Sequence, residues 1–469
     1  MKPVTLVWLR YELRVDDLPA LSAAVDRGGA VVPVYVFTPP DEYDGWYPGA
    51  ASRWWLHHSL LDLEKRYRQL GSPLVIRRGN AVTELQKVAR EVGADRLYYT
   101  ERVEPWARRQ ERQVSTVMQV QGFSGDLLWD PRRIETKSAG TYRVFTPFSR
   151  ACLERYKTRS PLSAPKELRP PELTAKSVAV DALRLLPSIP WDSGLASQWT
   201  PGSSAAQQQL GNWVSGQNVP HYVQGRDRPA ERGTGLLSPH FAFGELSVTR
   251  AWSVINARIE TDPLAAEGAI AWRRQLIWRE FARYLLWHQP HTVQAPLDAR
   301  YGTFPWRNDP EFLGRWQKGQ TGFPMVDAAM RQLWRTGWMH NRARMIVASF
   351  LVKDGLLDWR HGAHWFWDTL VDADLANNTM GWQWAAGCGA DAAPFFRVFN
   401  PLTQSKRYDP QAVYLKRWLP ELSELDPKSC HEPSKVPVLA PGYASPIVDH
   451  KVARLRALAV WKEAMRAGA

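Results

Sequence analysis

Tryptophan stands out when the sequence is searched for side chains that could do chemistry. The chain has 24 tryptophans in 469 residues, and most of them lie beyond residue 270. The segment AWRRQLIWREFARYLLW at 271–287 contains three of them, together with four arginines and one neutral amide, Gln275. Indole packs well in cores, but it also stacks on nucleic-acid bases and is easily oxidised. The excess therefore indicates base stacking or electron transfer in addition to packing.

The stretch WMHNRARMIVASFL at 338–351 places a polar, a cationic and a soft side chain on one helical face. Asn341, Arg344 and Met345 are spaced three and four residues apart, the separation at which helical side chains are neighbours. On an otherwise apolar helix this combination suits the edge of a planar heterocycle. A polar stripe facing solvent fits the same spacing equally well.

The stretch DTLVDADLANNTMGWQWAAG at 368–387 combines carboxylates with apolar residues. A buried carboxylate is costly unless it is paired, so Asp372 and Asp374 need partners, and Arg344 is a candidate partner for Asp372. A metal site is the rival interpretation. The histidines of HGAH at 361–364 are only three apart and lack the usual additional ligands, so the sequence favours a site without metal.

The turn GTGLLSP at 233–239 has the composition of a phosphate-binding turn. Thr234, Gly235 and Ser238 offer hydroxyl and backbone N–H groups to an anion. The same composition is common where a turn caps a helix. The motif alone does not decide between these two interpretations.

The overall charge predicts a polyanionic partner. The formal net charge is +13 and the sequence pI is about 9.7, which favours nucleic acid first and an anionic membrane second. Cys152, Cys388 and Cys430 form no CxxC pair, which argues against a disulfide framework and against a cysteine-bound metal or iron–sulfur site. No apolar stretch approaches the roughly 18 residues that span a bilayer. We expect a cytoplasmic protein.

The N-terminal residues have the pattern of a parallel α/β domain. Short continuous apolar runs, typical of strands covered on both faces, alternate with stretches of helical spacing. The expected strands are 4–9, 31–37, 73–79 and 96–100, and the expected helices are 52–71 and 81–93. Neither GxGxxG nor GxxxxGK[ST] is present, which argues against a standard dinucleotide or P-loop site. A doubly wound parallel sheet is predicted.

The composition changes in the later parts of the chain. Residues 157–205 are rich in Pro and Ser and weakly periodic, as in a connector that runs over the surface. Beyond them only helical spacing is found. The expected helices are 247–258, 266–288, 322–336, 338–353, 362–370 and 450–467. We expect an α/β domain over 1–130, a connector over 131–204 and an all-helical domain over 205–469.

Two long stretches carry a resemblance to a known family. The flavin core of the DNA photolyase/cryptochrome family resembles WQKGQTGFPMVDAAMRQLWRTGWMHNRARMIVASFL (316–351) and HWFWDTLVDADLANNTMGWQWAAGCGADAAPFFRVFNP (364–401). The class I cyclobutane pyrimidine dimer photolyases are the most similar branch. Weaker similarity extends to LVWLRYELRVDDLPAL (6–21) and to GTGLLSP. The resemblance implies a blue-light-driven lyase with an antenna-type N-terminal domain, bound FAD and a DNA partner, acting as a monomer.

The resemblance implies a set of FAD contacts in the helical domain. They are Tyr222, Thr234, Gly235, Leu237, Ser238, Trp272, Asn341, Arg344, Asp372, Asp374 and Asn378. Asn378 matches the residue that faces the flavin N5, where a neutral amide forms a hydrogen bond without adding negative charge. Gly235 stands where the family usually has Ser, which removes a hydroxyl but keeps the backbone N–H groups.

The resemblance also implies a path for electrons. Trp382, Trp359 and Trp306 match the family's chain of indoles between the flavin and the surface. For any one of them core packing would be the simpler explanation. Three matched positions favour electron transfer.

A lesion pocket is implied as well. The damaged dinucleotide must leave the duplex to be reached, and it would lie between Trp278 and Trp384, above Asn341 and Met345. Family members that repair (6-4) lesions carry histidines in the HNRARM stretch, so this chain is expected to act on cyclobutane dimers. The candidates for phosphate contacts are Arg226, Arg342 and Arg397, followed by Lys406 and Arg407. The four arginines of 271–287 are expected to add to the positive field around DNA.

Two features of the sequence depart from the family pattern. Repairing class I enzymes normally have Glu at the position of Gln275, and an amide donates hydrogen bonds but does not act as an acid. A flavoprotein of the cryptochrome type that binds FAD and DNA with impaired or no repair is therefore the alternative function. In the antenna region, Trp106 and Ala107 stand where folate-binding members often have polar contacts, so neither a folate nor a deazaflavin antenna is assigned.

Overall fold

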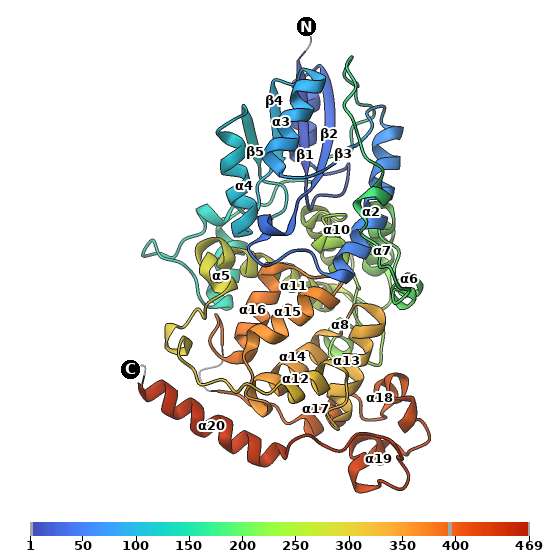
Figure 1. The fold of residues 1–469 in the computed structure, drawn as a ribbon, viewed down its shortest axis with the longest axis vertical. Helices are drawn as coiled ribbons and strands as arrows, with labels where there is room; N and C mark the ends of the chain where they lie inside the picture. Colours follow the sequence, from blue (N-terminus) through green and yellow to red (C-terminus); the bar gives the residue numbers. More distant parts are fainter. Residues whose placement is uncertain (1–2, 393–395, 468–469) are drawn as a thin grey trace.

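A five-stranded parallel sheet forms the N-terminal part of the computed structural model, which describes residues 3–392 and 396–467 (Figure 1). The strands are β1 (Val4–Leu9), β2 (Ala30–Phe37), β3 (Val75–Arg78), β4 (Arg96–Thr100) and β5 (Val120–Phe123). Their order is β3-β2-β1-β4-β5, and every neighbouring pair is parallel. The four strands predicted from apolar runs are confirmed. The fifth was missed because β5 is a half-exposed edge strand without a continuous apolar run.

Helices cover both faces of this sheet, which confirms the doubly wound architecture. The helices are α1 (Pro19–Asp26), α2 (Ala50–Gln69), α3 (Ala81–Val92) and α4 (Pro105–Ser115). Successive side chains of β1 point to opposite faces. Leu6 and Trp8 belong to the core cluster that contains the apolar side of α3, whereas Val7 and Leu9 belong to the cluster of α1 and α2.

The Pro/Ser-rich stretch runs largely over the surface and is anchored to the sheet domain. Its backbone donates from Leu168 to the Leu70 carbonyl at 2.6 Å and from Val178 to the Ile76 carbonyl at 3.0 Å. Helix α6 (Ser193–Gln198) lies within this stretch, and α5 (Phe145–Arg155) ends just before it.

The remaining described residues form helices and turns without a strand. The helices are α7 (Ser203–Ser215), α8 (Tyr222–Gly225), α9 (Ser238–Ala242), α10 (Val248–Thr261), α11 (Ala266–His288), α12 (Pro310–Gln317), α13 (Pro324–Thr336), α14 (Asn341–Ser349), α15 (Trp359–Thr369), α16 (Leu375–Ala386), α17 (Pro401–Tyr408), α18 (Val413–Trp418), α19 (Pro427–His431) and α20 (His450–Ala467). Figure 1 shows α11, α15 and α16 between the sheet and the helices α12, α17 and α20. Among the described residues, no helix has the length and apolarity needed to cross a membrane.

Candidate functional site

Helix α16 lies at the centre of the candidate site. It packs against α11, α14 and α15, and its N-terminus is capped by Asp374, whose side chain accepts from the Asn377 backbone N–H at 2.9 Å. A cap of this kind fixes where the helix starts. Asn378, in the first turn, donates from its amide to the Ala363 carbonyl of α15 at 2.9 Å. The cap therefore sets the position of Asn378 and of Trp382 and Trp384 further along.

Helix α14 supplies the polar face that the spacing predicted. The Nδ1 atom of His340 accepts from the Arg342 backbone N–H at 3.2 Å and so caps this helix. Asn341 and Met345 lie one turn apart, with the Asn341 amide nitrogen 3.9 Å from the Met345 sulfur. The predicted pairing with Asp372 is confirmed: Nη2 of Arg344 lies 2.8 and 3.1 Å from its two carboxylate oxygens.

Helix α11 carries the residues of the opening tryptophan-rich segment. Trp272 is buried in the core, whereas Gln275 and Trp278 are half-buried. Nη2 of Arg226 donates to Oε1 of Gln275 at 3.2 Å, and Nε2 of Gln275 donates to the Ala271 carbonyl one turn earlier at 3.1 Å. These two contacts orient the amide, so that its oxygen points to the arginine and its nitrogen to the helix.

The turn at 233–239 leads into α9, which begins at Ser238. Leu236 has a positive φ of 51°, a conformation that few non-glycine residues adopt. A Cβ added to Gly235 would lie 3.2 Å from the Trp213 ring, so a serine at 235 would press on that indole. The absence of a side chain at Gly235, where the sequence departs from the family pattern, thus leaves room for the Trp213 indole.

The other residues assigned to this turn differ in exposure. Tyr222 and Leu237 are buried, Thr234 is half-buried and Ser238 is exposed. The Oγ of Ser238 accepts from Nε1 of Trp338 at 3.3 Å.

Two of the three tryptophans predicted to carry electrons are buried, and the third lies nearer the surface. Trp382 and Trp359 are 2% and 1% exposed, while Trp306 is half-buried. Trp382 covers Gly362, where an added Cβ would lie 2.0 Å from the indole, and Trp359 stands three residues before that glycine on α15. Trp306 precedes Arg307, which forms an isolated bridge with Leu357 near the start of α15. The half-buried Trp306 and the two buried tryptophans fit a path for electrons that starts near the surface.

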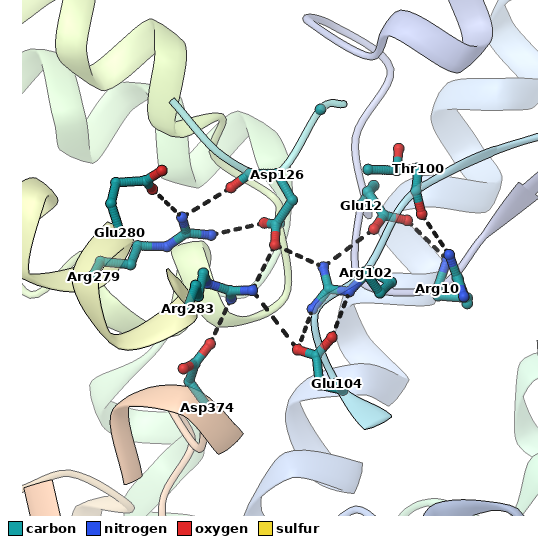
Figure 2. A network of polar contacts seen from close by, with 12 residues as sticks. Arg10, Glu12, Thr100, Arg102, Glu104, Asp126, Arg279, Glu280, Arg283 and Asp374 are labelled. Carbon is teal, nitrogen blue, oxygen red and sulfur yellow. Dashed lines mark hydrogen bonds and ion pairs between the residues drawn. The ribbon is translucent and has the colours of Figure 1, made fainter. Parts of the chain in front are cut away.

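A buried ion network joins α11 to the sheet domain (Figure 2). Arg279 and Arg283 were expected to contribute to the field around DNA, and this expectation is wrong. Both are buried, and their guanidinium groups lie 2.7 and 2.6 Å from the two oxygens of Asp126, which follows β5. Arg102, which follows β4, contacts the same carboxylate at 3.1 Å. Removing three cations from water is costly unless they are paired. The charges of these arginines are therefore balanced by buried carboxylates and are not presented to DNA.

The network also reaches α16. Nη2 of Arg283 donates to Oδ2 of Asp374 at 2.5 Å, so the residue that caps α16 is held by the helix that carries Trp278. Despite burial, the arginines Arg102, Arg283 and Arg279 keep the pKa of Asp126 well below its usual range. Burial raises the pKa of Glu280, which accepts from the Leu128 backbone N–H at 2.7 Å, to about 7. Asp126 was not predicted as a site residue. The feature that distinguishes it is its place after β5, a strand that the sequence did not predict.

The candidate phosphate contacts differ in how they are held. Arg342 is paired with Asp227 at 2.8 Å and lies over the Tyr408 ring at 4.4 Å. Arg407 also lies over that ring, at 5.3 Å. The Tyr408 ring, which was not predicted from the sequence, thus makes cation–π contacts with two of these arginines.

The remaining candidates differ in exposure. Lys406 is paired with Glu432 at 2.6 Å. Arg397 is exposed, and Arg226 is half-buried against Gln275.

The donor set fits a flavin dinucleotide. The Arg344–Asp372 pair, Asn378 and Asn341 present amide, guanidinium and carboxylate groups, which match the edges of a flavin or adenine ring. Thr234 and Ser238 present hydroxyls for phosphates. In the described ranges 3–392 and 396–467, no three His, Cys, Asp or Glu side chains are grouped as metal ligands.

The region assigned to an antenna is packed by aromatic side chains. Trp106 and Ala107 are buried, and the Trp106 ring lies 4.7 Å from that of Tyr43 and 6.1 Å from that of Tyr11. The cavity beside them measures about 20 Å³. The structure adds no side chains by which an antenna chromophore could be assigned.

Comparison with known proteins gives a consistent result. The family profile described as DNA photolyase matches residues 5–168, and the one described as FAD binding domain of DNA photolyase matches residues 272–463. The deoxyribodipyrimidine photo-lyase of Agrobacterium fabrum is 41% identical, covering 97% of this chain and 97% of that protein. Cryptochrome-1 of Arabidopsis thaliana is 35% identical, covering 96% of this chain and 69% of its own length.

A solved structure resembles the whole chain. A bacterial class III photolyase from Agrobacterium tumefaciens has a TM-score of 0.94 and 40% identity, covering 99% of this chain and 98% of that one. The comparisons support a photolyase, but the expected placement among class I enzymes is not confirmed.

Proposed function

Since this chain belongs to the DNA photolyase family, we propose that it splits cyclobutane pyrimidine dimers in DNA under blue light. The chain is a FAD-binding photolyase by its relatives and by its FAD-binding domain. The more specific proposal rests on one observation: Asn378, Trp382 and Trp384 all lie on α16. The start of this helix is fixed by the Asp374 cap.

The helices around α16 supply the groups that would hold FAD. Thr234, Ser238 and the turn between them would bind the phosphates, and Arg344 paired with Asp372 would bind a ring edge. Reduced FAD bound there and excited by blue light would lend an electron to the dimer, the two cyclobutane C–C bonds would break, and the electron would return to the flavin. Asn378 adds no negative charge near that ring system, which favours the reduced, anionic flavin that serves as the electron donor.

The lesion would lie between the half-buried indoles of Trp278 and Trp384. Each indole offers a face to a pyrimidine, and Asn341 with Met345 would form the floor. One N–H of the Gln275 amide donates to the Ala271 carbonyl, and its second N–H would donate a hydrogen bond to a lesion carbonyl but supply no proton. We propose that the resulting repair is slower than that of an enzyme with Glu at this position.

A cryptochrome-like protein is the second candidate, favoured by the amide at Gln275. It would keep FAD and the tryptophan chain and bind DNA without efficient repair. Cryptochromes are among the similar proteins, but the photolyase at 41% identity is matched along nearly its full length. We further propose that the protein acts as a monomer in the cytoplasm, which gel filtration and cell fractionation test.

Repair of a defined oligonucleotide separates the two functions. Reduced, FAD-loaded protein is illuminated with blue light in the presence of DNA containing one thymine dimer, with a dark sample as control. Restored thymines in the light alone support the photolyase. DNA binding without restored thymines supports the second candidate.

A further inference from the structure

The indole of Trp278 is covered on one face by a side chain from another part of the chain. Phe145, the first residue of α5, stacks on it with ring centroids 3.6 Å apart and planes 5° from parallel. Phe145 is buried, while Trp278 remains half-buried. Such complete overlap is less favoured between free rings than offset or edge-to-face contact. The surroundings therefore hold the two rings together.

A cation from the same helix as Trp278 also lies near the Phe145 ring. The guanidinium of Arg274 lies 5.1 Å from the Phe145 ring centroid. Arg274 and Trp278 are four residues apart on α11 and so lie on the same helical face. Phe145 thus contacts two side chains of one helix, Trp278 and Arg274.

The place of Phe145 is set by its backbone and not by the stack alone. Its backbone N–H donates to a carboxylate oxygen of Asp391 at 3.2 Å, and the Asp391 N–H donates to the Arg143 carbonyl at 3.0 Å. Asp391 follows the end of α16, the helix that carries Trp384. The start of α5 is therefore tied to the segment after α16 and stacked on Trp278, one wall of the proposed lesion pocket.

We propose that Phe145 is a positioning residue that fixes the indole of Trp278 for the lesion. Its ring closes one face of the indole, so a pyrimidine finds only the other face. Because the side chain is already ordered, binding does not require the indole to lose further rotational freedom. The inference deepens the proposed function and rests on it.

The test compares Phe145→Leu with Phe148→Leu in the full-length, FAD-loaded protein. Phe148 lies on the same helix and is also buried, but its ring contacts Phe281 and Tyr284, both at 5.0 Å, instead of Trp278. Affinities are measured for a duplex with one thymine dimer and for the same duplex undamaged. Phe145→Leu should weaken binding of the damaged duplex by about tenfold and leave the undamaged duplex and flavin photoreduction unchanged.

The control variants separate positioning from general stability. Phe148→Leu should keep the preference for damaged DNA, and Phe145→Tyr, which retains a stacking ring, should restore it. Retained preference in Phe145→Leu, or an equal loss in Phe148→Leu, would overturn the proposal.

A second measurement does not depend on repair or on dimer binding. A crystal structure of Phe145→Leu, or of Phe145→Met if the leucine variant does not fold, should show the Trp278 indole turned or poorly ordered. An unmoved indole would overturn the positioning role. If instead the wild type shows no preference for damaged DNA while the indole moves in the variant, the proposed function fails and the positioning role stands.

Discussion

Arg226 donates a hydrogen bond to the side-chain oxygen of Gln275 at 3.2 Å. With glutamate in this place the contact would be an ion pair, and the arginine would be partly neutralised. With the amide, Arg226 keeps its full charge for a DNA phosphate. The departure at Gln275 therefore removes an acid from the lesion site and leaves more positive charge beside it.

Gln275→Glu should change repair and DNA affinity in opposite directions. Repair of a bound dimer by reduced protein should rise by about tenfold or more, because a carboxyl group can exchange a proton with the lesion as it takes up an electron, which an amide cannot do. Affinity for undamaged DNA should fall by a few-fold, with a shallower salt dependence, because one phosphate contact is weakened. Arg228→Ala is the control, since this exposed arginine is already paired with Glu231 at 3.0 Å. Unchanged repair in Gln275→Glu would show that the amide is not limiting.

Trp382→Phe should block photoreduction of oxidised FAD but spare repair by protein that was reduced beforehand. Phenylalanine fills most of the space over Gly362 but is much harder to oxidise than indole. Transient absorption measures the photoreduction. Trp334→Phe, a change at a residue that is 61% exposed on α13, is the control and should leave photoreduction intact. Normal photoreduction in Trp382→Phe would remove this tryptophan from the path.

Asp126→Asn should loosen the junction of the sheet domain with α11. Arg102, Arg279 and Arg283 would lose their shared carboxylate, and breaking a buried ion pair typically costs about 3–5 kcal/mol. Urea unfolding measures the loss, and faster FAD release should accompany it because Arg283 also holds Asp374. Glu101→Gln at the more exposed pair with Arg132 should cost less than about 1 kcal/mol. Equal effects of the two variants would contradict the role of the network.

His340 should make the stability of the site depend on pH. Burial, reinforced by Arg344 and Arg342 and opposed by Asp227, lowers the pKa of His340 from 6.5 to about 4. Between these values the unfolded chain binds the proton and the folded chain does not. The contribution of neutral His340 to the free energy of unfolding is therefore fully present above pH 6.5 and is lost as the pH falls toward 4. The loss between pH 7 and pH 5 should be about 2 kcal/mol.

The change His340→Asn tests this assignment. Asparagine also caps helices but does not titrate, so the pH dependence of unfolding and of FAD release should become flatter in the variant. An identical pH profile in wild type and variant would assign the dependence to other groups.

Local patterns in the sequence were sufficient for much of the fold. The apolar runs of β1 and β2 and the periodicity of α11 predicted those elements closely. The Arg344–Asp372 pair was predictable because a carboxylate among apolar residues needs a partner. The division of the chain at residues 130 and 204 stays a prediction, as do the roles of the assigned site residues.

What could not be predicted depends on contacts distant in sequence. Arg279 and Arg283 look like surface charges, because Asp126 lies 153 and 157 residues away in the chain. Phe145 falls in a segment expected to be a connector, so nothing in the sequence indicated its stack on Trp278. Helical spacing identifies neighbours on one helix but not the partner on another.

Light-driven repair by the pre-reduced wild-type protein is the most direct test of the proposed function. Protein loaded with FAD is reduced in the dark, mixed with an oligonucleotide that contains one thymine dimer and exposed to blue light. We predict that thymines are restored in the light and not in the dark. Thymine restoration by neither the wild type nor Gln275→Glu, despite bound FAD and bound DNA, would contradict the assignment of this chain as a dimer-splitting photolyase.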